Sequence, residues 1–268
     1  MRDRSRQGRL VLGMALLGLA AVVVQDARRA TGAIARIRRT GVLRVGTTGD
    51  YDPFSVVDAC GRYRGIDVEA AHRLAATVGP GCGCGSCELP GRPDRRSARP
   101  AASTSPWAGS AATGKRAEAG LLSRPYLTDA KVALIRAADR HRFRTLADID
   151  RPGMTVLVNP GGTNQQFVAA HVRQARVNVV PDNLAIPGKV AAGAGDVMFT
   201  DGIEARLYAH RDRRLAVALA DSTLMTVEKV ALLCRRHDVD LLPVVDAAIS
   251  AMQADGTYAR LRAKYVGD

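Results

Sequence analysis

Apolar and polar residues follow one another along the chain in patterns that predict strands and helices in turn. Val42 to Thr47 alternates with the period of a strand, and Gly49, Asp50 and Pro53 then break the pattern. Apolar residues recur at helical spacing from Ile66 to Val78. This opening therefore predicts a strand, a loop and a helix, which together are half of a parallel α/β unit.

The same alternation continues through the second half of the chain. We expect strands at 131–135, 155–158, 177–180, 196–200 and 229–234, and helices at 163–173, 182–192, 202–210, 238–254 and 257–265. A short helix is also expected at 33–39, ended by Gly41, and Pro187-Gly188 weakens the helix at 182–192. Because strands alternate with helices, the crossovers between parallel strands should be right-handed.

The chain is long enough to form two lobes. Its 268 residues, 47% of them hydrophobic, are consistent with lobes of about 100 to 130 residues. We assign 41–136 to lobe 1, 137–228 to lobe 2, and 229–268 to a return strand and C-terminal helices. No internal repeat is found.

The first 30 residues differ from the rest. Four arginines precede an apolar run from Leu10 to Val24. This run fits a signal-peptide core better than a membrane span, which needs about 20 residues. No clear cleavage site follows, so 1–30 is expected to be a signal peptide or an N-terminal anchor. We expect the protein to be exported, to a periplasmic or extracellular location.

The net charge of +13 does not by itself indicate a nucleic-acid partner. The arginines are scattered, with local density only near the N-terminus and between Arg92 and Arg99, and no basic helix carries interleaved aromatic residues. An anionic small molecule is therefore the more economical partner, and we expect no nucleic acid.

Residues 80–114 read unlike the rest of the chain. Gly, Pro, Ser, Cys and Arg dominate, and no strand or helix period survives. Cys82, Cys84 and Cys87 resemble half of a zinc site, but no second Cys/His pair has suitable spacing, so we predict no metal. A disordered or disulfide-bearing insertion is one interpretation of this stretch.

Four segments carry a family resemblance: GVLRVGTTGDYDPFS, SRPYL, VNPGGTNQQF and FTDGIEARL. In this order and spacing they resemble cyclohexadienyl dehydratases, which are enzymes built on the family 3 solute-binding fold. The resemblance runs from about 41 to 78 and from 116 to 267. It implies a periplasmic-binding-protein-like (type II) α/β fold, with central sheets flanked by helices and a ligand cleft between two lobes. It also implies conversion of prephenate or arogenate to phenylpyruvate or phenylalanine, with no metal or organic cofactor.

The resemblance gives 80–114 a second interpretation. In a shifted reading frame with permitted codons, the stretch can encode R-T-S-W-P and F-D-V-A-V-G-G-I-S. Related dehydratases carry similar segments in this interval. We therefore hypothesise compensating frameshifts near 78–81 and 114–116. The chain as written would then lack part of lobe 1, including a pocket tryptophan, and can be inactive.

Two candidate carboxylate-binding sites follow from these segments. Gly161, Gly162 and Thr163 lie where a strand turns into a helix, so their N–H groups can bind an anion. An ordinary turn with a threonine N-cap is the alternative. Arg116, ten residues before Tyr126, has the spacing of the family's carboxylate-binding arginine. A solvated surface arginine is the alternative there.

Asp201 and Glu204 fall where a strand enters a helix, the edge at which open α/β sheets place ligand groups. The resemblance implies that the position of Asp201 binds an α-amino group in binding-only relatives. It implies that Glu204 is the catalytic general acid in the dehydratases. The alternative is that both carboxylates cap the helix N-terminus.

The segment after the first strand should form the facing wall of the cleft. Asp50 belongs to this wall, Thr48 or Tyr51 can hydrogen-bond the substrate, and Phe54 can pack against its ring. Phe54 fits an ordinary core position equally well. Asn159 can reach the ligand from the hinge side, or satisfy the turn that follows it.

Two functions remain open at this point. The first is a dehydratase with Glu204 as the acid. The second is a periplasmic amino-acid-binding protein that delivers its ligand to an ABC permease, with Asp201 on the amine and Arg116 on the carboxylate. Glu204 discriminates between them, because catalysis needs it and generic amino-acid binding does not. A sensor or relic without a ligand is a third class.

Overall fold

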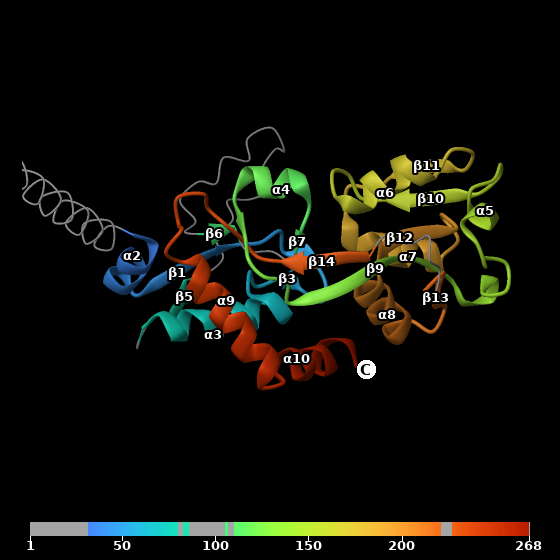
Figure 1. Ribbon diagram of the computed structural model, residues 1–268. Helices are drawn as coiled ribbons and strands as arrows, with labels where there is room; N and C mark the ends of the chain where they lie inside the picture. Colours follow the sequence, from blue (N-terminus) through green and yellow to red (C-terminus); the bar gives the residue numbers. More distant parts are fainter. Residues whose placement is uncertain (1–31, 80–82, 86–104, 107–109, 221–226, 268) are drawn as a thin grey trace, which may run out of the picture.

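The computed structural model describes residues 32–79, 83–85, 105–106, 110–220 and 227–267. The expected signal peptide or anchor at 1–30 lies outside the described residues, as does most of 80–114. Within the described ranges, no helix has the length and apolar character needed to cross a membrane. The elements gather into two lobes, with the long strand β9 running from one lobe to the other (Figure 1).

Lobe 1 is built around the parallel strand β1, Val42–Gly46. The strand order is β5-β1-β6, and both neighbours, β5 (Gly83–Gly85) and β6 (Ser105–Pro106), are parallel to β1. Both lie inside 80–114, where the hydrophobic pattern predicted no strand. Helix α2 (Ala33–Thr40) ends at Gly41, whose φ of 67° is left-handed, as expected for a glycine that stops a helix.

The segment after β1 forms a small antiparallel sheet of order β2-β3-β4. Its strands are β2 (Asp50–Tyr51), β3 (Ser55–Val57) and β4 (Tyr63–Arg64). Helix α3 covers Ile66–Val78, the range that the apolar spacing predicts, and buries Leu74 and Val78. Helices α9 (Leu242–Ala254) and α10 (Thr257–Val266) pack beside α3, and the end of α10 lies near α8 (Gly202–Arg211) (Figure 1).

Lobe 2 contains most of a sheet of order β11-β10-β12-β9-β14-β7, with β13 also paired to β9. The strands are β7 (Ser110–Ala111), β9 (Leu127–Arg136), β10 (Thr155–Val158), β11 (Arg176–Val179), β12 (Val197–Asp201), β13 (Leu215–Ala218) and β14 (Val227–Ala231). β9 pairs with β12 and β13 through 131–136 and with β14 through 127–130. One strand therefore ties the lobes together.

Helices cover this sheet and are joined by short elements. They are α5 (Leu146–Ile149), α6 (Thr163–His171), α7 (Ile186–Ala191) and α8 (Gly202–Arg211), with the 3-10 turns η1 (Ala137–Asp139) and η2 (Asn183–Ala185). The predicted helix at 182–192 is thus divided in two, and Pro187 sits in the first turn of α7, where its missing N–H is tolerated. Helix α4 (Gly114–Ala119) and strands β8 (Leu121–Leu122) and β15 (Leu233–Cys234) lie by lobe 1.

The apolar core follows the lobes but does not stop at their boundary. Val156, Phe167 and Phe199 lie in one buried cluster of lobe 2, and Leu157 and Met198, their neighbours along the strands, lie in another. The lobe 1 cluster includes Ile203 and Leu207 from α8, a helix that follows a strand of lobe 2. Helix α8 is therefore fixed by the packing of both lobes.

Candidate active site

Glu204 is fully buried in the first turn of α8 and is held by two neutral side chains. The Thr200 hydroxyl bonds to Oε2, and Asn183 Nδ2 donates to Oε1 at 3.2 Å. With 0% of its surface exposed, burial raises the pKa of Glu204 to about 7, although the Thr200 bond, the Lys131 charge and the Asn183 bond oppose the rise. A carboxyl group with this pKa can hold a proton at neutral pH and give it up to a substrate.

Neither Asp201 nor Glu204 caps helix α8. Asp201 occupies the N-cap position, but its side chain makes no capping hydrogen bond. Asp129 does this instead, because its Oδ2 accepts the N–H of Ile203 at 2.8 Å. The capping alternative is therefore wrong for both carboxylates.

Lys131 is a central site residue that the sequence patterns missed. Its side chain lies in β9 with 0% exposure, and its Nζ is 2.6 Å from Asp201 Oδ1, 2.9 Å from Thr163 Oγ1 and 3.4 Å from Glu228 Oε2. Burial lowers the pKa of Lys131, and the Glu228 carboxylate opposes the change. The available signal was a lysine that directly precedes the apolar run at 132–135, where a buried charge needs a partner.

Asp201 connects lobe 2 to the segment that follows β1. Its second oxygen accepts a hydrogen bond from the Tyr51 hydroxyl. Burial and the carboxylates of Glu204 and Glu228 raise the pKa of Asp201, and the ammonium of Lys131 is the adjacent cation. The structure therefore brings Tyr51, predicted in the facing wall, into contact with Asp201 at the end of β12.

Arg116 lies on α4 and is half-buried, which differs from a fully solvated surface arginine. Burial lowers the pKa of its guanidinium, and the charge of Glu228 opposes this effect. Glu228 also contacts Lys131. Hereafter, the charged cluster is the set of five side chains joined by these contacts and by the electrostatic interactions between their charges: Arg116, Lys131, Asp201, Glu204 and Glu228.

The turn before α6 contributes to the same region. Gly161 has a left-handed φ of 79°, a conformation that glycine adopts without strain. Gly162, not Thr163, is the N-cap, so the threonine N-cap alternative is wrong. Thr163 is the first helical residue and turns its hydroxyl to Lys131, while the Gly161 N–H bonds to the Gln165 side chain.

The remaining predicted residues differ in where they lie. Thr48 is exposed at the end of β1, and Asp50 contributes its backbone carbonyl, which accepts from Asn183 Nδ2 at 3.1 Å. Phe54 is 1% exposed in the lobe 1 core, with its ring centroid 4.9 Å from that of Tyr51, so the core interpretation describes it. Asn159 Oδ1 is buried without a hydrogen-bond partner among the described residues.

Comparison with known proteins identifies the family. The family model described as "Bacterial extracellular solute-binding proteins, family 3" matches residues 43–268. The chain belongs to this family. The predicted two-lobed α/β fold is confirmed, since solved structures similar to the chain are two-lobed binding proteins.

The similar proteins in family 3 include an enzyme and several binding proteins. The chain is 37% identical over 222 residues to the cyclohexadienyl dehydratase of Pseudomonas aeruginosa, covering 83% of this chain and 80% of that protein. An ancestral amino acid-binding protein, titled a precursor of cyclohexadienyl dehydratase, is 26% identical with a TM-score of 0.75, covering 88% and 99% of the two chains. An L-arginine-bound substrate-binding protein from Streptococcus pneumoniae, at 23% identity and a TM-score of 0.76, shares the fold over 88% and 98%.

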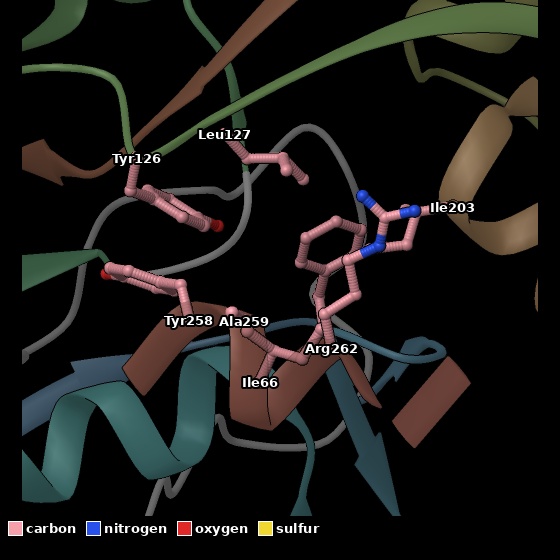
Figure 2. Close-up of a pocket in the computed structure, with 8 residues that line it drawn as sticks. Ile66, Tyr126, Leu127, Ile203, Tyr258, Ala259 and Arg262 are labelled. Atoms are coloured by element: carbon pink, nitrogen blue, oxygen red, sulfur yellow. The ribbon is translucent and has the colours of Figure 1, made fainter. Parts of the chain in front are cut away.

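A pocket of about 240 Å³ lies apart from the charged cluster. Its lining is mostly apolar and comprises Phe54, Ile66, Tyr126, Leu127, Ile203, Tyr258, Ala259 and Arg262. Figure 2 shows Tyr126 and Tyr258 facing each other at one end and Arg262 reaching toward Ile203 at the other. Only Phe54 among the predicted site residues lines it, so this pocket is not the predicted carboxylate site.

The described residues offer little for metal binding. Within the described part of the chain, no group of three or more His, Cys, Asp or Glu side chains is placed to hold a metal ion. Two carboxylates of the charged cluster, Asp201 and Glu228, contact the ammonium of Lys131. The expectation of no cofactor stays a prediction.

Proposed function

We propose that this protein is an exported enzyme that removes water and carbon dioxide from prephenate or arogenate. The products would be phenylpyruvate and phenylalanine, respectively. The observation that carries the proposal is Glu204, a fully buried carboxyl group whose pKa is raised to about 7. The 37% identity to a cyclohexadienyl dehydratase supports the same substrate class.

The proposed reaction needs one proton donor and groups that hold carboxylates. Glu204 gives its proton to the ring hydroxyl, and the C–O bond breaks to release water. The bond between the ring and its carboxylate breaks as carbon dioxide leaves, and that electron pair completes the aromatic ring. Glu204 then regains a proton from solvent. Because aromatisation drives the step, the protein mainly has to orient the substrate and supply the acid.

The carboxylates of the substrate would be held by cations and N–H groups around Glu204. Arg116 offers a planar guanidinium suited to bidentate contact. The backbone N–H of Gly162, the N-cap, lies at the positive end of the α6 dipole, whereas the N–H of Gly161 is bonded to the Gln165 side chain. Lys131 supplies positive charge beside the acid without leaving its contact with Thr163. Thr48 and Asn159 are proposed to complete the polar wall, with Tyr51 opposite.

The alternative function is amino-acid binding for an ABC permease, which several structural neighbours support. It requires Asp201 to bind the ligand's α-amino group. Both Asp201 oxygens already accept hydrogen bonds, one from Lys131 and one from Tyr51. Generic amino-acid binding also gives no reason to bury Glu204. The contacts of Asp201 with Lys131 and Tyr51 therefore favour the dehydratase.

The test is to incubate the purified protein with prephenate and with arogenate and to quantify phenylpyruvate and phenylalanine by chromatography. We expect Glu204→Gln to lower kcat about 100-fold or more, since general acids contribute about 10²- to 10⁴-fold. Glu118→Gln is the matched control, because Glu118 is exposed on α4. Assaying the frame-restored chain in parallel separates a damaged enzyme from a binder. A restored chain that binds amino acids tightly and leaves both substrates unchanged would establish the alternative.

A further inference from the structure

Three consecutive residues of lobe 1 each contact a different residue of lobe 2. The Asp50 carbonyl accepts from Asn183 at 3.1 Å, the Tyr51 hydroxyl donates to Asp201, and Asp52 Oδ2 lies 2.5 Å from Arg211 Nη1. We call Asp50, Tyr51 and Asp52 the docking segment. Two of its three contacts end on Asp201 or on a residue bonded to Glu204, so the docking segment and the acid are physically connected.

Asn183 makes that connection through a single nitrogen. Its side chain is 5% exposed, and Nδ2 lies within hydrogen-bond distance of both Asp50 O and Glu204 Oε1. A backbone carbonyl can only accept, so the NH₂ group of Asn183, not its oxygen, must face Asp50. The second hydrogen of the same NH₂ group then points to Glu204. Oε1 is therefore an acceptor whenever the docking segment is in place.

The other oxygen of Glu204 has a partner of a different kind. Oε2 bonds to the Thr200 hydroxyl, which also accepts from Asn164 Nδ2 at 3.3 Å. A hydroxyl can donate or accept, so this contact tolerates a proton on Oε2. The two oxygens of Glu204 are thus chemically distinct in the folded protein.

We propose that Asn183 is a positioning residue that places the acidic proton of Glu204 on Oε2, and that it does so only while the docking segment lies against lobe 2. This inference rests on the proposed function for its catalytic meaning. Its structural content is independent of any substrate. It predicts that opening the cleft removes the Asp50 acceptor and leaves the Asn183 NH₂ group, and with it the acidic proton of Glu204, without a fixed orientation.

The electrostatic surroundings of Glu204 give the direction of the effect. Lys131 on β9 lowers its pKa and Asp52 in the docking segment raises it. Asp201 at the end of β12 and Tyr208 one turn along α8 are the other titratable neighbours that sense the Glu204 charge. The Asn183 hydrogen bond stabilises the ionised carboxylate and so lowers the pKa. Removing it should raise the pKa further and make Glu204 a weaker acid.

The first experiment uses Asn183→Leu, which keeps the approximate side-chain volume and removes the donor. We expect kcat at saturating substrate to fall about tenfold. In a plot of kcat against pH, the alkaline limb, where kcat declines, should move to higher pH, since this plot reports the pKa values of groups in the bound complex. Asn178→Leu is the control, because Asn178 is exposed on β11 in the same lobe. A merely structural role would lower the yield of folded protein without moving the limb, and that result would overturn the proposal.

The second experiment needs no turnover. The side-chain NH₂ resonances of Asn183, recorded by ¹H–¹⁵N NMR, should titrate with a midpoint near the Glu204 pKa of about 7. The titration should disappear in Glu204→Gln. Asn183 NH₂ chemical shifts that change neither with pH nor in Glu204→Gln would refute the proposal even if the enzyme is active. A titrating amide in a protein that leaves prephenate and arogenate unchanged would instead refute the proposed function alone.

If Asn183→Leu does not fold, Asn183→Asp replaces it. The aspartate has nearly the shape of asparagine but cannot donate when ionised, and its charge adds to the carboxylates around Glu204. We expect the same upward shift of the alkaline limb, larger than in the leucine variant. A limb unchanged from wild type in this variant would likewise overturn the assignment of Asn183.

Discussion

Lys131 Nζ lies 2.6 Å from Asp201 Oδ1, and the lysine side chain is completely buried. Glu228 is the second carboxylate in contact, at 3.4 Å, and the Thr163 hydroxyl accepts a third bond. A buried ammonium is tolerated only when its hydrogen-bonding capacity is met in this way. Lys131 is therefore the cation that allows several carboxylates to be placed close together between the lobes.

Replacing Lys131 by Met should destabilise the protein by about 3 to 5 kcal/mol, because buried carboxylates would lose their compensating charge. Urea unfolding followed by circular dichroism measures this change. Lys189→Met is the control, since Lys189 is exposed on α7 and should change stability by less than about 0.5 kcal/mol. Equal effects of the two substitutions would contradict the role of Lys131.

Stability should fall as pH rises through the range set by Glu204. Its pKa is raised from 4.5 to about 7 on folding, so the folded state binds more protons than the unfolded state between these values. Below pH 4.5 the carboxyl is protonated in both states and does not lower the free energy of unfolding. As the pH rises, this free energy decreases, and the loss reaches about 3 kcal/mol above pH 7. Urea midpoints at pH 5 and pH 8 measure the change, which should shrink in Glu204→Gln. An unchanged difference in that variant would assign the effect to other groups.

Substituting Tyr51 by Phe removes the hydroxyl that donates to Asp201 across the lobes. We expect KM to rise about tenfold or more, since one hydrogen bond to a charged group contributes about 1.5 to 3 kcal/mol. Steady-state kinetics with prephenate test this expectation. Tyr265→Phe also removes a carboxylate hydrogen bond, to Glu69 and away from the charged cluster, and should leave KM unchanged. A similar rise in both variants would argue against a specific closing contact.

The DNA encoding 78–116 should differ from that of related genes by a compensating pair of single-base changes. Resequencing this interval decides the matter, and intact alignment at both ends removes the frameshift hypothesis. If the hypothesis holds, the frame-restored chain should unfold at a higher temperature than the chain as written, because several core side chains would be regained at about 2 to 5 kcal/mol each. Differential scanning calorimetry of the two chains compares them directly.

Sequence patterns predicted the regular elements well where the apolar period was long. The helix at Ile66–Val78 and the strand at Thr155–Val158 have the bounds that the spacing indicated. The single helix predicted at 182–192 is instead a 3-10 turn followed by an α-helix that begins at Ile186, and the turn places Asn183 beside Glu204. The hydrophobic period does not reveal this division. Local periodicity carries no information about such a contact.

The site was predictable only in part, for a similar reason. Glu204 and Asp201 were predicted because they follow a strand end, and Arg116 because its spacing to Tyr126 resembles that of the family's arginine. Lys131 and Asn183 were missed, since each acquires its role from partners 21 to 133 positions away in the chain. Phe54 was ambiguous, and packing in lobe 1 decided in favour of the core.

The apolar side of α8 inserts Ile203 and Leu207 into the core of lobe 1, while the strand that leads into this helix belongs to the sheet of lobe 2. Glu204 consequently lies on a helix that packs against both lobes of the molecule. Loosening the lobe 1 interior anywhere, including beneath β1, would be transmitted to the proton donor through two aliphatic side chains. Altered residues in lobe 1 can thus abolish activity without contacting Glu204 or the substrate.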